Sequence, residues 1–99
     1  MINSRRPVLR GSILAFLSAV YPEQVEEESI IKIKYQFYEP SDIRKALEYL
    51  VDSKYIDRII RKHPAQLEKK VRFYKILPPG VNLADGVATD PGVIVEEGL

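Results

Sequence analysis

The sequence predicts an α+β fold, mostly α, in which three helices are followed by a β-hairpin. The helical part is predicted most clearly by the stretch EPSDIRKALEYLVDSKY, residues 39–55, because its apolar side chains recur at helical spacing. The hairpin is predicted by two runs rich in Ile, Val, Phe and Tyr, YIDRIIRK and KKVRFYKIL, since these residue types favour strands. The proline-containing segment HPAQLE joins the two runs and forms the expected tip. A chain of 99 residues has room for one domain with a modest core.

The first helix is expected from about Val8 to Val20. Pro22 ends the run, and the apolar residues at helical spacing are Leu9, Ile13, Phe16, Leu17 and Val20. Basic residues followed by the apolar stretch ILAFLSAV are also typical of signal peptides, but this stretch is short and a helix of the fold explains it better. No apolar run approaches the roughly 20 residues that span a bilayer, so we expect no membrane-spanning segment.

The stretch SIIKIKYQF, residues 29–37, fits two structures. Its apolar residues alternate with polar ones, as in a half-buried strand: Ile31, Ile33, Tyr35 and Phe37. Apolar residues also recur at offsets of three and seven, which fall on one side of a helix. We predict a helix, because the glutamates at positions 26–28 favour a helix start through the helix dipole. The short connection YEP to the next helix then makes a helix-turn-helix.

The third helix has the best-signalled start. Pro40 suits the first helical position, and a neighbouring Glu39, Ser41 or Asp42 can act as cap. One face is apolar and is formed by Ile43, Ala46, Leu47, Leu50 and Val51, while the opposite face carries Ser41, Arg44, Lys45, Glu48 and Asp52. Beyond the hairpin, glycines and prolines predict one short helical turn around Val81–Asp85 and then an extended tail.

The segments PSDIRKALEYLVDSKYIDRI and VRFYKILPPGVNLADG together resemble a winged-helix domain, in which a helix-turn-helix is closed by a β-hairpin wing. The phrase LVDSKYIDR is similar to the L-x-x-G-Y-I phrase of many such proteins, with Ser53 and Lys54 where a glycine is usual. The returning strand is similar as well, with Leu77 in the usual Thr place and Gly80 retained. The phrases LRGSILAFLSAVYPE and ILPPGVNLADGVATDPGV also resemble small winged-helix proteins of Mu-like phages and prophages, which implies a bacterial or prophage setting.

Charge is segregated along the chain although the formal net charge is only +1. Residues 54–75 hold eight basic side chains against Asp57 and Glu68, whereas residues 76–99 hold four acidic side chains and no basic one. Phosphate neutralisation supplies most non-specific affinity for DNA, so the hairpin is a candidate contact with double-stranded DNA. The alternative is a solvated hairpin whose lysines prevent edge-to-edge aggregation, but the basic excess is larger than that purpose needs. The candidate DNA-binding residues here are Arg58, Arg61, Lys62, Lys69, Lys70 and Arg72, with a tip formed by His63, Pro64, Ala65 and Gln66.

The N-terminal half of the third helix is the second candidate surface. Ser41, Arg44 and Lys45 are of the types that contact phosphates or base edges in a major groove. Glu48 and Asp52 would repel phosphate, so the C-terminal half is excluded. An ordinary solvated helix face is the alternative interpretation. A small basic arm is formed by Arg5, Arg6 and Arg10. One interpretation is that it tracks a DNA backbone, but we expect flexible, solvated residues instead.

No catalytic, metal or cofactor site is predicted. The chain has no cysteine and one histidine, His63, which leaves no nucleophile–base pair and excludes most zinc sites. It shows no Gly-rich phosphate loop. We therefore expect no enzymatic activity. Aromatic residues expected in the core or at its boundary are Tyr35, Phe37, Tyr38 and Tyr49, with Tyr49 and Tyr55 as alternative members of a dimer face.

Residues 1–86 are thus expected to form a single winged-helix domain and residues 87–99 an acidic C-terminal tail. The expected function is binding of double-stranded DNA by a cytoplasmic transcriptional regulator or architectural factor. We expect a homodimer, because one small module has a limited contact area. The alternative is a protein–protein interaction module that keeps the fold without the DNA role. The near-neutral total charge favours it, as does an acidic tail that can fold back onto the wing or bind a partner.

Overall fold

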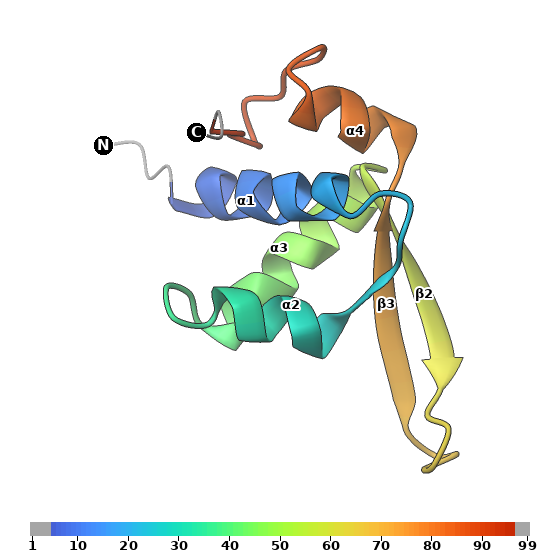
Figure 1. Cartoon of the computed structure of the whole chain (residues 1–99). Helices are drawn as coiled ribbons and strands as arrows, with labels where there is room; N and C mark the ends of the chain where they lie inside the picture. The colour runs from blue at the N-terminus through green and yellow to red at the C-terminus, as the bar shows by residue number, and fades with distance from the viewer. Residues whose placement is uncertain (1–4, 97–99) are drawn as a thin grey trace.

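Helices and strands are mixed along the chain in the computed structural model, which describes residues 5–96. In chain order the elements are α1 (Arg5–Ala19), β1 (Val25–Glu26), α2 (Glu27–Lys34), α3 (Pro40–Asp52), β2 (Ile56–Lys62), β3 (Lys70–Ile76) and α4 (Pro78–Ala84). The strands form an antiparallel sheet in the order β1-β3-β2. The helices α1, α2 and α3 lie on one side of the sheet, and the β2–β3 hairpin extends well beyond them (Figure 1). The predicted α+β class is confirmed.

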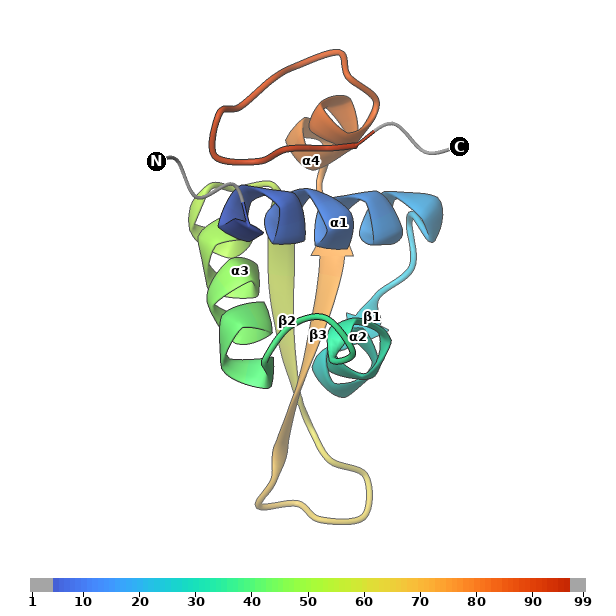
Figure 2. The same ribbon diagram turned by 90° about the vertical axis from the view of Figure 1, so that its left-hand side faces the viewer.

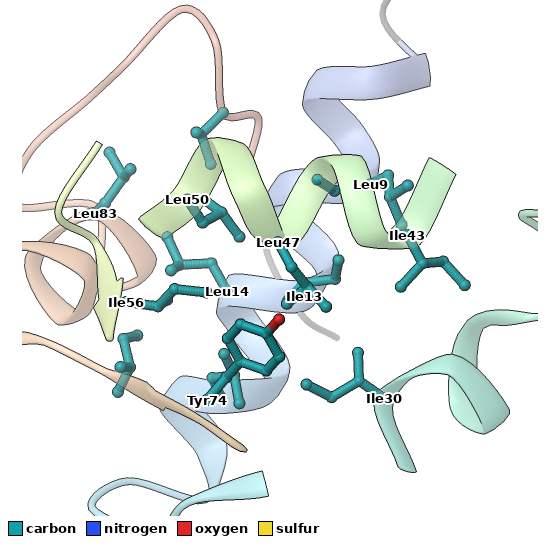
Figure 3. Packing of buried hydrophobic residues seen from close by; sticks show 14 of the residues in the cluster. Leu9, Ile13, Leu14, Ile30, Ile43, Leu47, Leu50, Ile56, Tyr74 and Leu83 are labelled. Carbon is teal, nitrogen blue, oxygen red and sulfur yellow. The ribbon is translucent and has the colours of Figure 1, made fainter. Parts of the chain in front are cut away.

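The core lies between α1, α3 and the near end of the sheet. Ile13, Leu47 and Ile76 are completely buried, and Tyr74 of β3 is 1% exposed. Figure 3 shows the Tyr74 ring among side chains from α1, α2 and α3. Each of these helices therefore buries one apolar face around the Tyr74 ring, as the amphipathic spacing of the sequence requires.

Among the described residues the helix α1 spans Arg5–Ala19, so it includes three residues before the predicted start at Val8. Pro7 is tolerated because the N–H groups of the first turn have no partner within the helix. The expected flexible arm is therefore wrong for Arg5, Arg6 and Arg10, which all lie on a helix. This helix holds the three residues at fixed positions near α3.

The helix α2 confirms the helical interpretation of residues 29–34, but it ends at Lys34 instead of residue 37. Glu39 must be extended because it precedes Pro40, so the chain leaves the helix early in order to turn. Tyr35 and Phe37 consequently lie in the connection and are 61% and 68% exposed. The prediction that these two aromatic residues belong to the core or its boundary is wrong.

Lys54 occupies the position where the L-x-x-G-Y-I phrase has its glycine, and its φ of 67° is in the left-handed region. The amide of Lys54 donates to the Val51 carbonyl at 3.0 Å, and that of Tyr55 donates to the Leu50 carbonyl at 3.0 Å. These two bonds form a Schellman motif, which ends α3 and directs the chain into β2. The helix-to-wing turn is thus kept without its usual glycine, at a conformational cost to Lys54.

The segment that follows α4 lies across α1 and not over the hairpin (Figure 1). Val93 is 4% exposed, and the Ile94 amide donates to the Pro7 carbonyl at 3.0 Å. Asp90 accepts hydrogen bonds from the Tyr55 hydroxyl at 2.5 Å and the Gly92 amide at 2.7 Å. Both bonds, the Tyr55 bond first, lower the pKa of Asp90. Within residues 87–96 of the predicted tail, Val93 therefore belongs to the core and polar contacts hold the segment, although Val87 is 77% exposed. Residues 97–99 of that tail lie outside the described residues.

Two short elements differ from what the sequence predicts. The strand β1 was not predicted, because two residues show no period, yet it pairs Val25 with Tyr74 and Glu26 with Phe73. The helix α4 begins at Pro78, before the expected Val81, since proline suits a first helical position.

Candidate nucleic-acid interface

The register of β2 and β3 divides the hairpin into two faces. Successive side chains of a strand alternate between faces, and the buried Tyr74 and Ile76 mark the face that carries the helices. Arg58 pairs with Tyr74, Ile60 with Arg72 and Lys62 with Lys70. The basic side chains on the helix side are therefore Arg58, Lys62, Lys70 and Arg72.

The half of this face nearer the hairpin tip carries basic side chains close together, an arrangement that lowers the stability of the sheet. Lys62 and Lys70 lie directly opposite each other, and both are exposed. Like charges in this cross-strand position destabilise a sheet. Arg72 follows on the same face two residues along β3, beside the exposed Ile60. Because the hairpin extends past the helices (Figure 2), this cationic surface is open to a partner.

Arg58 joins the hairpin to α3 instead of pointing freely into solvent. Its guanidinium contacts the Glu48 carboxylate at 2.5 Å, and its Nε donates to the Tyr74 hydroxyl at 3.3 Å. The side chain of Arg58 is only 23% exposed. The pair neutralises Glu48, the acidic residue nearest the centre of the helix face, and sets the hairpin beside α3.

The outward face of α3 carries Ser41 and Lys45 in its N-terminal half, and both are exposed. Arg44 lies toward α2, where its guanidinium is 3.6 Å from the Glu27 carboxylate and 3.7 Å from that of Glu28. It is still half-exposed. Of the three residues predicted on this helix, Arg44 thus shares its charge with α2, whereas Lys45 forms no ion pair within residues 5–96.

A buried polar contact lies beneath this surface. Glu27 is 9% exposed, and the Tyr74 hydroxyl donates to its carboxylate at 2.8 Å. Burial is the main reason why the pKa of Tyr74 is raised, although the adjacent Arg58 acts in the opposite direction. In the sequence the glutamates indicated only a helix start. Nothing in their spacing indicated that Glu27 would meet a tyrosine 47 residues away.

The remaining candidates lie elsewhere on the hairpin. Arg61 is on the face away from the helices, where it donates to the Gln24 side chain at 3.0 Å and lies over the Phe73 ring. Lys69 is exposed in the tip. His63 holds the tip turn, because its Nδ1 accepts hydrogen bonds from the amides of Ala65 and Gln66, both at 3.1 Å. The structure therefore brings Lys62, Lys70 and Arg72 together and separates Arg61 from them.

Metal-binding clusters and membrane spans are both absent from the described part of the chain. Within residues 5–96, no group of three His, Asp or Glu side chains is placed to hold a metal ion. No helix of this same part of the chain has the length and apolarity to cross a membrane.

The order α1-β1-α2-α3-β2-β3, with a hairpin beside the third helix, is that of a winged-helix fold. No protein-family model and no curated protein matches the chain. Its fold is similar to that of Bacillus subtilis PadR in a crystal structure with operator DNA, with a TM-score of 0.59 and 18% sequence identity. The match covers 87% of this chain and 53% of the PadR chain, so the chain spans about half of PadR. This likeness confirms the predicted fold type.

Proposed function

We propose that this protein binds double-stranded DNA through the helix-side face of its hairpin and the N-terminal half of α3. The observation that carries the proposal is the Lys62–Lys70 pair with Arg72, because stability gives no reason for like charges directly opposite each other. The similar PadR chain was crystallised with operator DNA. Ser41 would face the major groove and Lys45 a phosphate at its edge, while the hairpin would contact the neighbouring backbone.

The finer role proposed is that of a cytoplasmic transcriptional regulator or architectural factor of bacterial or prophage origin. We assign it no catalytic activity and no cofactor. A homodimer is proposed because one small module offers limited contact area on DNA. Sedimentation at micromolar concentration, with and without duplex, measures the stoichiometry.

Two matched pairs of substitutions test which hairpin face contacts DNA. Lys62→Gln with Lys70→Gln removes two charges from the helix side, whereas Arg61→Gln with Lys75→Gln removes two from the other face. Affinity for a mixed-sequence duplex is measured over a range of salt concentrations. Each lost phosphate contact lowers the log–log salt slope by about 0.9, so we expect a reduction of about 1.8 for the first pair and little change for the second. Equal reductions for both pairs would show non-specific attraction to total charge.

A second candidate function is protein–protein interaction, and the exposed apolar residues at the end of α2 and in the α2–α3 connection favour it. Ile33, Tyr35 and Phe37 are each about half or more exposed, and Ile33 and Phe37 line one groove with Phe16 of α1. Exposed apolar patches of this kind mark interaction sites. The two functions are distinguished by the wild-type titration, since an interaction module without the DNA role would not bind duplex at low salt.

A further inference from the structure

A cavity of about 250 Å³ lies between the N-terminal end of α1 and the adjacent side of α3. This volume is below the about 300–1,000 Å³ of pockets that enclose drug-sized ligands, so it suits one small group. Its lining is formed by Arg5, Arg6, Leu9, Arg10, Tyr38, Asp42, Lys45 and Ala46. Four cationic side chains thus surround the space, and Asp42 is the one carboxylate among the lining residues.

The arginines of this cavity are positioned by aromatic rings. The Arg10 guanidinium lies 3.7 Å from the centre of the Tyr49 ring and donates to the Gly92 carbonyl at 3.0 Å. Its Nε is buried and makes no hydrogen bond with any residue of the described range 5–96. The Arg5 guanidinium lies over the Tyr38 ring at 4.5 Å. Stacking leaves the charge of each guanidinium in place while it restricts the side chain.

The cavity lies on the side of α3 that faces α1, and no residue of the hairpin lines it among the described residues. Asp42, Lys45 and Tyr49 follow one side of the helix, since they are three or four residues apart, and this side faces α1. Glu48 contacts Arg58 on the hairpin side. Lys45 is exposed on the outward face and also lines the cavity, so the cavity is continuous with the proposed DNA surface.

We propose that this cavity is an anion site for a DNA phosphodiester, contacted by Arg6, Arg10 and Lys45. The inference rests on the proposed function and adds a contact with the backbone on the side of α3 away from the wing. Planar guanidinium groups suit phosphate oxygens, and their stacking orders them before the anion arrives. In Figure 2 the N-terminal end of α1 lies above α3 while the hairpin extends below the helices, so the two basic regions flank α3.

The test compares Arg6→Gln with Lys32→Gln, which removes one exposed charge from α2, away from the cavity and the hairpin. Arg6 is chosen because it is exposed and, unlike Arg10, forms no hydrogen bond with residues 87–96. Each variant is titrated with a mixed-sequence duplex at 50 and 200 mM salt. A slope change of about 0.9 over this range means that wild type loses about 3.5-fold more affinity than Arg6→Gln. Lys32→Gln should behave like wild type.

Equal salt dependence of Arg6→Gln and Lys32→Gln would overturn the proposal. If the Lys62→Gln, Lys70→Gln pair still lowers the slope in that case, the proposed DNA function stands and only the cavity assignment fails. A second arm adds inorganic phosphate at constant ionic strength and follows the amide signals of Arg6 and Lys45. Saturable shifts, together with an unchanged salt slope in Arg6→Gln, would assign the cavity to free phosphate and overturn the duplex assignment.

Discussion

The hydroxyl of Tyr74 makes a contact whose removal has a calculable cost. Tyr74→Phe keeps the buried ring but removes the donor at 2.8 Å from the Glu27 carboxylate, together with the acceptor of the longer 3.3 Å bond from Arg58 Nε. Glu27 is 9% exposed, so water replaces the lost bond poorly, and Arg44 at 3.6 Å remains its cationic neighbour. A hydrogen bond to a charged group contributes about 1.5–3 kcal/mol, and we expect the free energy of unfolding to fall by about 2 kcal/mol.

Urea denaturation at pH 7, followed by circular dichroism, measures this change. The midpoint should fall with little change in the denaturant slope, because the fold and the surface exposed on unfolding stay the same. Tyr21→Phe is the control, since Tyr21 is 50% exposed, and it should change stability by less than about 0.5 kcal/mol. A loss for Tyr74→Phe as small as that of the control would refute the argument that the buried carboxylate depends on this donor.

Three other substitutions test the turn and the C-terminal segment. In Gly11→Ala the new Cβ would lie 1.7 Å from the Ile94 carbonyl oxygen, so Val93 should leave its site and stability should fall by about 1–2 kcal/mol despite better helix propensity. Unchanged hydrogen exchange at the Ile94 amide would contradict this. The pKa of Asp90 is lowered in the folded protein, so its contribution is present above pH 3.8 and lost as the pH falls below that value. Asp90→Asn should flatten this acid limb in thermal melts, and an unaltered limb would argue against it. Lys54→Gly relieves the cost of a left-handed backbone conformation, so the free energy of unfolding should rise by about 0.5–1 kcal/mol and the urea midpoint should rise with it. A lower midpoint would disprove the strain.

The elements that the sequence predicted well are those whose signals are local. The helix α3 combines an apolar face with Pro40 at its start, and the hairpin combines two β-favouring runs with a turn. The segment at residues 29–37 carries strand and helix periods at once, and only its neighbours favour the helix. The predicted end of α2 is wrong because the extended conformation before Pro40 needs a longer connection than YEP.

The features that were missed depend on residues far apart in the chain. Glu27 contacts Tyr74 through tertiary packing, and no pattern in the neighbouring sequence predicts that Glu27 is buried. The cationic cavity joins Arg6 and Arg10 to Lys45, and no short motif relates positions that far apart. The separation of Arg61 from Lys62 is different, because the alternation of side chains along β2 already places neighbouring residues on opposite faces.

The most direct test of DNA binding is a fluorescence anisotropy titration of the wild-type protein with a mixed-sequence duplex at 50 and 200 mM salt. Four phosphate contacts, made by Lys45, Lys62, Lys70 and Arg72, predict that affinity falls on the order of 100-fold between these concentrations. Absence of binding at 50 mM, or an affinity that does not change with salt, would contradict the proposed function.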